Sequence, residues 1–380
     1  MKIADRVERV PPSGIRRFFE LATEAEDVIS LGVGEPDFAT PWSAREAAIA
    51  SLERGRTSYT SNRGLPELRT AIARREREQR DLHYDSENEI LVTAGASEAL
   101  DLAFRALVDP GDRVAISQPS YVCYPPGAIF AGGEVLPVPT RAAEDFTLTR
   151  EALEASGAAD AAVLVLCYPN NPTGATMSES ELEPIAEFCR EHDLAVISDE
   201  IYADLTYDHE HASIATLPGM RERTIVVNGF SKAYAMTGLR LGYALAPPKA
   251  SAAMTRVHQY AMLSAPTTAQ HAAIDALSDC EEDVQEMRTQ YDRRRRFVLA
   301  RFAEMGIECF EATGAFYVFP EVPGGDSEAF AEALLEEAGV AAVPGDVFGE
   351  GGAGHLRVSY ATGLADLREA LDRIEAFIEA

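Results

Sequence analysis

Between about residues 90 and 246, the chain alternates short apolar, β-branched runs with stretches of helical spacing. The runs are Ile90–Thr93, Arg113–Ser117, Ala161–Tyr168, Leu194–Ser198, Thr224–Asn228 and Leu239–Ala246. This alternation indicates strand–helix–strand units. Runs that are apolar throughout, such as Ala162–Leu166, are typical of strands buried on both faces of a mainly parallel sheet. Because such sheets bind their ligands at the carboxyl ends of the strands, we expect the functional residues there.

The pattern changes after about residue 275. A long charged helix over Glu281–Phe302 is followed by the strand-like Gly314–Phe319, a helix over Ser327–Ala338, the strand-like His355–Tyr360 and a terminal helix. Strands and helices without the earlier rhythm indicate a smaller α+β domain. We therefore predict a large domain over residues 46–274. We predict a small domain built from residues 1–45 and 275–380, which closes over the substrate to exclude water.

The 380 residues include 34 basic and 62 acidic side chains, which give a formal net charge of −28. This charge argues against a nucleic-acid-binding protein, which needs a basic face to meet phosphates. Only Lys2, Lys232 and Lys249 are lysine, and the other 31 basic residues are arginine. An acidic excess with few lysines is expected of a protein that works in concentrated salt, where repulsion between carboxylates is screened. The alternative is an ordinary acidic protein from an arginine-biased genome.

The five cysteines are odd in number and form no CxxC pair, which indicates a reducing compartment. Residues 1–21 lack the apolar core of a signal peptide. The longest apolar stretch, Ala161–Tyr168, is far shorter than the roughly 20 residues of a membrane-spanning helix. We therefore predict a cytoplasmic protein that contacts no membrane, and the sequence suggests no metal site.

The segment Asn228–Tyr243 contains the strongest catalytic candidate. Lys232 follows the end of a predicted strand, and Arg240 comes eight positions later. A lysine in this setting can form a Schiff base once burial or neighbouring cations depress its pKa. The alternative is a surface lysine, but the scarcity of lysine in this chain favours the functional interpretation.

A carboxylate stands at the end of another apolar strand, in Ile197–Tyr202. Asp199 must be paired or hydrogen-bonded there, because an unpaired buried charge is costly. A protonated pyridine nitrogen would be such a partner, and Tyr202 could then offer its hydroxyl to the phenolate oxygen of the same ring. The alternative is an aspartate that caps the next helix.

Two further segments complete the pattern. The loop Tyr168–Gly174 presents Asn171 after a buried strand, and Val92–Leu100 turns from strand to helix through small residues that include Ser97. Free N–H groups at such a helix start can bind phosphate. A turn-forming asparagine and an ordinary strand-to-helix turn are the alternatives. Together, the four segments agree on one ligand, a phosphorylated pyridine aldehyde.

The sequence resembles the class I/II pyridoxal-phosphate-dependent aminotransferases of fold type I, the superfamily of aspartate and aromatic aminotransferases. The matching motifs, in order, are Leu31–Phe38, Tyr59 with Gly64–Arg69, Asn170–Gly174, Ser198–Tyr202, Ser231–Gly242 and Leu356–Thr362. The resemblance covers nearly the whole chain. It implies an α/β fold in which a large domain holds a mainly parallel seven-stranded sheet, beside a smaller α+β domain.

The resemblance also implies roles for single residues toward pyridoxal 5'-phosphate. Lys232 would hold the cofactor covalently and move the substrate proton, and Asp199 would keep the pyridine nitrogen protonated. The remaining implied cofactor contacts are Asn171 and Tyr202 to the ring oxygen, Ala96, Ser97, Arg240 and Ser231 to the phosphate, and Tyr121 stacked on the ring. Tyr59 matches the tyrosine that reaches the phosphate of the neighbouring subunit, which implies a homodimer.

For the substrate, the resemblance implies that Arg357 grips the α-carboxylate with help from the Gly34 amide and Asn171, since a guanidinium pairs with a carboxylate bidentately. The implied activity is a ping-pong transfer of an amino group from an L-amino acid to a 2-oxo acid, with 2-oxoglutarate expected as acceptor. A carbon–sulfur β-lyase with the same cofactor is the alternative. A cofactor-binding regulator is a more distant one, because it would normally carry a DNA-binding module.

The chain departs from the family at one position that bears on specificity. Some aspartate-preferring relatives have a lysine where this chain has Ser97, which is followed by Glu98. Without that cation, and with a carboxylate close by, an acidic substrate side chain would need another positive group. We expect apolar contacts from the region of Ile15 and from Phe316 to favour aromatic or aliphatic substrates.

Overall fold

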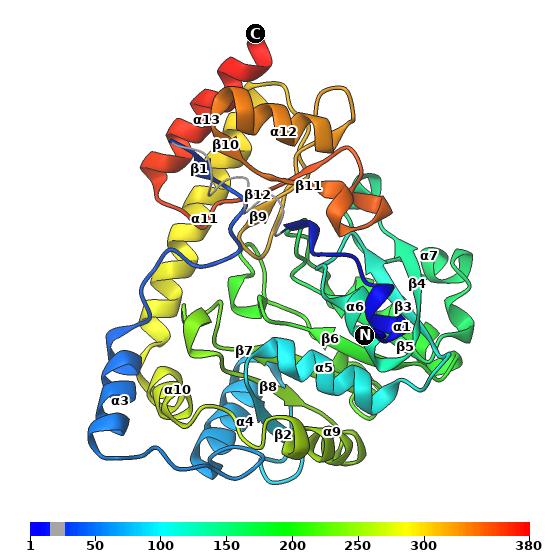
Figure 1. The fold of residues 1–380 in the computed structure, drawn as a ribbon, viewed down its shortest axis with the longest axis vertical. Helices are drawn as coiled ribbons and strands as arrows, with labels where there is room; N and C mark the ends of the chain where they lie inside the picture. Colours follow the sequence, from blue (N-terminus) through cyan, green and yellow to red (C-terminus); the bar gives the residue numbers. More distant parts are fainter. Residues whose placement is uncertain (16–26) are drawn as a thin grey trace.

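The computed structural model describes residues 1–15 and 27–380, and a seven-stranded sheet lies in the lower part of the view in Figure 1. The strands follow one another in the spatial order β2-β8-β7-β6-β5-β3-β4. Their bounds are β2 Ile90–Thr93, β3 Arg113–Gln118, β4 Glu134–Pro139, β5 Val163–Cys167, β6 Ala195–Asp199, β7 Thr224–Gly229 and β8 Gly242–Leu245. The predicted fold class, a mainly parallel seven-stranded sheet in an α/β protein, is confirmed.

Strand β8 is the exception to the parallel arrangement. It pairs antiparallel with both β2 and β7, whereas β4, β3, β5, β6 and β7 pair in parallel. Since β2 and β7 flank β8, they run in the same direction as the other parallel strands. The carboxyl ends of six strands and the beginning of β8 therefore meet at one edge of the sheet, which we call the carboxyl edge.

Strand β4 was not predicted from the sequence. Its residues Glu134–Pro139 include Pro137 and Pro139, and prolines cannot donate to a strand ladder. The strand lies at the edge of the sheet, where it pairs with β3 alone. Its prolines are tolerated because one side of an edge strand needs no partner.

Helices cover both faces of the sheet, as the strand pattern requires. In β5, Leu164 packs into a core with Phe188 of α8, whereas Val163 and Val165 pack on the other face with Phe104 of α5. The helices before the second unit are α1 Asp5–Glu8, α3 Trp42–Glu53, α4 Pro66–Arg80, α5 Ala96–Leu107, α6 Tyr124–Ala131, α7 Arg150–Ala155, α8 Glu179–Glu191, α9 Pro248–Ala261 and α10 Thr267–Asp279. Because successive β5 residues face opposite cores, this strand is apolar throughout.

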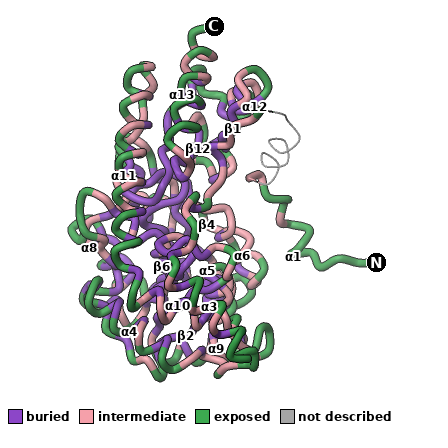
Figure 2. Tube along the Cα trace, turned by 90° about the vertical axis from the view of Figure 1, so that its left-hand side faces the viewer, coloured by how far each residue is buried: buried purple, intermediate pink, exposed green. Residues whose placement is uncertain are grey.

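A second unit lies above the carboxyl edge, at the top of Figure 1. Its elements are helices α11 Glu281–Glu304, α12 Ser327–Ala338 and α13 Leu364–Glu379, with strands β1 Ile29–Ser30, β9 Tyr317–Val318, β10 Val340–Ala341, β11 Val343–Pro344 and β12 Leu356–Ser359. Strands β11, β12 and β9 form one antiparallel sheet, and β1 pairs in parallel with β10. Figure 2 shows that buried chain continues between the two units without a break. No helix in the described part of the chain combines the length and apolarity needed to cross a bilayer.

Candidate active site

A cleft of about 830 Å³ opens at the carboxyl edge, between the sheet and the second unit. It brings together every predicted site residue except Tyr59. The predicted residues that line it are Gly34, Ala96, Ser97, Tyr121, Asn171, Asp199, Tyr202, Ser231, Lys232, Arg240 and Arg357. Tyr59 is 81% exposed and does not line the cleft.

Lys232 enters the cleft from the loop between β7 and β8. Its ammonium nitrogen Nζ donates a 2.6 Å hydrogen bond to the main-chain oxygen of Gly34. The nitrogen lies 5.7 Å from the centre of the Tyr202 ring and 5.5 Å from that of Phe316. Burial and, next, the nearby Arg357 guanidinium lower the pKa of Lys232 to about 8. At this pKa most of the amine is still protonated near neutral pH, but the neutral fraction, which can act as a nucleophile or proton acceptor, is much larger than that of an ordinary lysine.

Asp199 is the last residue of β6 and is only 4% exposed. One carboxylate oxygen, Oδ2, accepts a 2.8 Å hydrogen bond from the Tyr124 hydroxyl, and Oδ1 accepts one of 3.2 Å from the main-chain N–H of Ile201. Burial raises the pKa of the carboxyl to about 6, although these two hydrogen bonds oppose the rise. Tyr124 was not predicted as a site residue, because nothing in its sequence context marks it.

Asn171 is held in the cleft by its neighbour. Asn170 accepts hydrogen bonds from the N–H and hydroxyl of Thr173, and its amide nitrogen donates to the main-chain oxygens of Pro119 and Cys167. These bonds close the loop after β5. Asn171 then accepts a 2.9 Å hydrogen bond from Arg357 through Oδ1.

Arg357, in β12, is only 2% exposed. One of its terminal nitrogens bonds Asn171, and the other donates a 2.6 Å hydrogen bond to the main-chain oxygen of Gly32. Its Nε is buried and has no partner among the described residues. The guanidinium lies 4.6 Å from the centre of the Tyr317 ring. A buried, incompletely satisfied guanidinium at the wall of a cleft is suited to bind a carboxylate.

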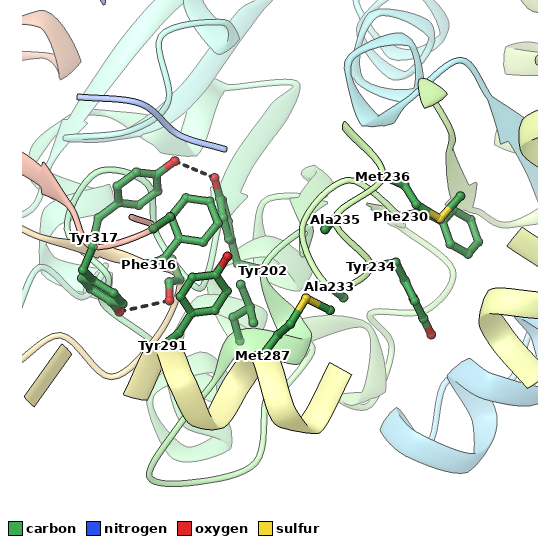
Figure 3. Close-up of a cluster of buried hydrophobic side chains, with 14 of the residues drawn as sticks. Tyr202, Phe230, Ala233, Tyr234, Ala235, Met236, Met287, Tyr291, Phe316 and Tyr317 are labelled. Carbon is green, nitrogen blue, oxygen red and sulfur yellow. Dashed lines mark hydrogen bonds between the residues drawn. The ribbon is translucent and has the colours of Figure 1, made fainter. Parts of the chain in front are cut away.

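Tyr202 and Tyr317 join the two units at the cleft. Their hydroxyl oxygens lie 2.9 Å apart (Figure 3). Gly34 approaches this pair closely, because a Cβ at this position would collide with the Tyr317 hydroxyl. The Gly34 backbone, the hydroxyls of Tyr202 and Tyr317 and the Lys232 amine thus lie close together in the cleft.

The amino-terminal end of α5 forms one wall of the cleft. Its N-cap, Gly95, has a φ of +85° and no side chain to cap the helix. A Cβ at Gly95 would lie 2.7 Å from a terminal nitrogen of Arg240, and a Cβ at Gly242 would lie 2.5 Å from the main-chain nitrogen of Ala96. The two glycines therefore let the guanidinium and the start of β8 approach the first N–H groups of the helix. This arrangement binds anions, since helix starts and arginine both favour negative charge.

One expectation about the substrate end of the cleft is wrong. Glu98 does not line the cleft: its carboxylate accepts a 2.5 Å hydrogen bond from the N–H of Ala94 and lies 2.7 Å from Nδ1 of the fully buried His258. Its negative charge is therefore engaged away from the ligand. Phe316 lies in the turn before β9, and Tyr317 rather than Phe316 lines the cleft. The Phe316 ring is nevertheless 5.5 Å from the Lys232 nitrogen, so its contact with the substrate stays a prediction. Ile15 does line the cleft, as predicted.

These groups fit a phosphorylated pyridine. The uncapped start of α5 beside Arg240 fits a phosphate, and the buried Asp199 carboxylate fits a ring nitrogen that carries a proton. Lys232 lies within the same cleft and fits an aldehyde. No group of three or more potential metal ligands was found in the described part of the chain.

Comparison with known proteins gives full-length matches. Residues 26–374 match the family described as aminotransferase class I and II. The aspartate aminotransferase of Pyrococcus abyssi is 45% identical, over 99% of this chain and 98% of that protein. The aromatic-amino-acid aminotransferase 2 of Thermococcus litoralis is 41% identical, over 100% of this chain and 99% of that protein. The structure of Thermus thermophilus aspartate aminotransferase with maleate matches with a TM-score of 0.94 at 39% identity, covering 99% of this chain and 100% of that one.

Proposed function

We propose residue roles and a substrate class for this chain, which belongs to the family of class I and II aminotransferases. The chain is an amino-acid aminotransferase that depends on pyridoxal phosphate. The single observation that carries the proposed roles is the cleft in which Lys232, Asp199 and Arg357 converge.

Each part of the cofactor has a matching group in the cleft. The phosphate would be held by the N–H groups of Ala96 and Ser97 with Arg240 and Ser231, the ring nitrogen by Asp199, the ring oxygen by Asn171 and Tyr202, and the ring face by Tyr121. When bound, pyridoxal phosphate supplies an electron sink that acidifies the Cα–H bond of an attached amino acid. Asp199 would strengthen this effect by favouring a protonated ring nitrogen.

Lys232 would provide both the covalent attachment and the proton transfer. Its Nζ, more readily deprotonated than that of an ordinary lysine because of the lowered pKa, can in its neutral form accept the proton from the substrate Cα. Arg357 would bind the α-carboxylate through its buried guanidinium and, with Asn171, fix the direction of the Cα–H bond relative to this amine. The protein's contribution is then orientation and a dry, preorganised charge distribution.

The cleft favours an apolar donor side chain. A second cavity of about 700 Å³ adjoins the cleft and is lined mostly by apolar residues. The residues that line both are Ser13, Ser97, Leu100, Tyr121 and Val122. The other lining residues include Val10, Pro11, Pro12, Phe104, Pro125, Pro126, Ile129, Phe130, Val347 and Phe348. Its charged lining residues, among those described, are the carboxylates Asp101 and Asp346. We therefore propose that the chain prefers aromatic or aliphatic amino acids over aspartate and glutamate.

The acceptor proposed from the sequence is 2-oxoglutarate. No basic residue is left to pair with its second carboxylate. In the described part of the chain, the only basic residues that line the cleft are Lys232, Arg240 and Arg357, and each already has a proposed role. An apolar 2-oxo acid should therefore be compared with it directly.

Absorbance spectroscopy tests this proposal. The purified protein should show a visible cofactor band that converts to the near-ultraviolet on addition of phenylalanine or leucine and returns with a 2-oxo acid. We expect kcat/KM for phenylalanine to exceed that for aspartate by at least about tenfold, since an unpaired charge disfavours the acidic side chain. Aspartate as the best donor would overturn the proposed preference, and a band that never converts would contradict the proposed half-reactions.

A matched variant sharpens this test. Ser97 lines both the cleft and the second cavity, so Ser97→Lys would place a cation between them. The variant should raise the ratio of aspartate to phenylalanine kcat/KM, and an unchanged ratio would show that the second cavity does not hold the donor side chain.

We also propose that the chain forms a homodimer. Large apolar side chains are exposed on α3, on the following loop and at the end of α9, namely Trp42, Ile49, Leu52, Tyr59, Tyr260, Met262 and Leu263. Asn62 donates a 2.7 Å hydrogen bond to the main-chain oxygen of Leu263, which places the Tyr59 loop beside this end of α9. An exposed apolar surface of this kind is typical of an interface, and Tyr59 would reach the phosphate of the second subunit.

A surface adapted to concentrated salt is the remaining proposal from composition. The net charge is −28, so the carboxylates repel one another. Raising the salt from about 0.1 M to 1 M shortens the screening length of this repulsion from about 10 Å to about 3 Å. If the surface is adapted to salt, the melting temperature should rise across this series. If the chain forms a dimer, the mass measured by sedimentation at high salt should be twice that of one chain. A melting temperature that does not change with salt would contradict salt adaptation, and a single-chain mass would contradict the dimer.

Two further proposals concern organisation and location. We propose the domain division given above, 46–274 against 1–45 with 275–380, which the pairing of β1 with β10 supports. We propose a cytoplasmic location, which is consistent with five cysteines that are all free in the described residues.

A further inference from the structure

Tyr124 is a buried residue that contacts the proposed machinery directly and has no assigned role. It is the first residue of α6 and is 1% exposed. Its hydroxyl donates the 2.8 Å hydrogen bond to Oδ2 of Asp199. Pro125 and Pro126 follow it in the first helical turn, where proline fixes the backbone without losing a helical hydrogen bond. The position of the hydroxyl is therefore set by a rigid start of a helix.

The Asp199 carboxylate has few other partners. Its second oxygen bonds only the Ile201 N–H among the described groups. The charged and titratable groups near it, besides Tyr124, are Glu200 next to it in the chain, Lys232 from the β7–β8 loop, the Tyr121 hydroxyl, and the thiols of Cys123 and Cys167. Glu200 is engaged elsewhere, since Ser198, Ser213 and His211 bind its carboxylate.

We infer that Tyr124 is a positioning residue of the reaction, whose hydrogen bond fixes the orientation of Asp199 and favours its ionised form. This inference rests on the proposed role of Asp199. A hydroxyl that donates a hydrogen bond to a carboxylate stabilises the ionised form relative to the protonated form, because the ionised form can only accept. Because burial already raises the pKa of Asp199 to about 6, loss of the donor would leave less of the carboxylate ionised near neutral pH.

The same turn connects two parts of the site. The ring of Tyr121, the proposed stacking residue, meets the Tyr124 ring edge to face at 6.0 Å between ring centres. Tyr124 therefore holds the carboxylate at its hydroxyl and supports the stacking residue at its ring. The Tyr124→Phe variant keeps the ring contact and removes the hydroxyl, which bonds Asp199 and also contacts the Cys167 thiol.

The test begins with the cofactor-free, full-length protein. An infrared titration follows the carbonyl stretch of the protonated Asp199 carboxyl, which is assigned by its loss in Asp199→Asn. In Tyr124→Phe this signal should persist to higher pH, with a proton affinity about tenfold greater, since a hydrogen bond to a charged group is worth at least a factor of this size. In the holoenzyme, kcat near pH 6 to 7 should fall while KM stays unchanged, and raising the pH should restore kcat.

Two variants keep the outcome decisive. Tyr168→Phe removes a buried hydroxyl that donates to the main-chain oxygen of Phe146, so it controls for the loss of a hydroxyl alone and should leave the Asp199 signal unchanged. If Tyr124→Phe does not fold, substitution of Tyr124 with 3-fluorotyrosine strengthens the donor and should shift the titration to lower pH. If the Asp199 titration were the same in Tyr124→Phe and in the 3-fluorotyrosine protein as in the unmodified protein, the inference would be overturned. Full activity of Asp199→Asn would instead overturn the proposed role of Asp199.

Discussion

Lys232→Ala is expected to lower kcat by at least about 10⁴-fold, because the variant loses both a nucleophile and a proton-transfer group. Lys232 is the only lysine that lines the described cleft, so no neighbouring amine can replace it. The lowered pKa shows that the cleft makes this amine easier to deprotonate than one in water. The loss should therefore appear with every amino-acid donor alike.

The measurement combines steady-state rates with absorbance spectra. The variant should still bind pyridoxal phosphate, held by the α5 end and Arg240, but the band of the covalently attached cofactor should be absent. Lys249→Ala is the matched control, because Lys249 lies exposed in the first turn of α9, and it should leave both rate and spectrum unchanged. Substantial turnover by Lys232→Ala would refute the assignment of the catalytic amine.

Arg357→Gln is expected to lower kcat/KM by about 10²- to 10³-fold, since truncating one partner of a buried charge pair costs a few kcal/mol. Glutamine can still reach toward Asn171 but cannot offer two parallel donors to a carboxylate. The loss should be similar for phenylalanine, leucine and aspartate, because the α-carboxylate is common to all of them.

A substrate pair checks this assignment. Phenylethylamine lacks the α-carboxylate of phenylalanine, so its low rate should change little in the variant. Arg301→Gln provides the control, because Arg301 pairs with Asp372 and Glu375 within the second unit and does not line the cleft. If the amine and the amino acid lost activity equally, Arg357 would have a structural role instead.

The sequence predicts the elements and the chemistry of the cleft better than its side-chain directions. Apolar runs bounded by polar residues locate β5, β6 and β7, and the residues that follow them, such as Lys232, must reach the carboxyl edge whatever the details of packing. Strand β4 is not a continuous apolar run, because it contains two prolines, and so this pattern does not predict it. Whether Glu98 faces a ligand depends on His258, which is about 160 residues away, and no local pattern contains that information.

The same limit explains Tyr124 and Phe316. A tyrosine before two prolines predicts a helix start but not a carboxylate partner 75 residues further along the chain. In the strand-like Gly314–Phe319, only Tyr317 and Val318 form β9, and Phe316 lies in the turn before it. The alternation of a strand therefore does not apply to Phe316, and the position of Tyr317 is fixed only when β9 pairs with β12.

The reversed direction of β8 has a consequence for how this enzyme can change in length during evolution. Lys232 and Arg240 both lie on the single connection between β7 and β8, and both strands are paired with each other. An insertion or deletion there would move the Lys232 amine relative to the Arg240 guanidinium, which we propose holds the phosphate. Asn171 and Asp199, by contrast, are separated by a crossover that contains α8, whose length can vary while each strand end stays in place. Length variation among descendants of this gene should therefore collect in the crossovers and spare the β7–β8 connection.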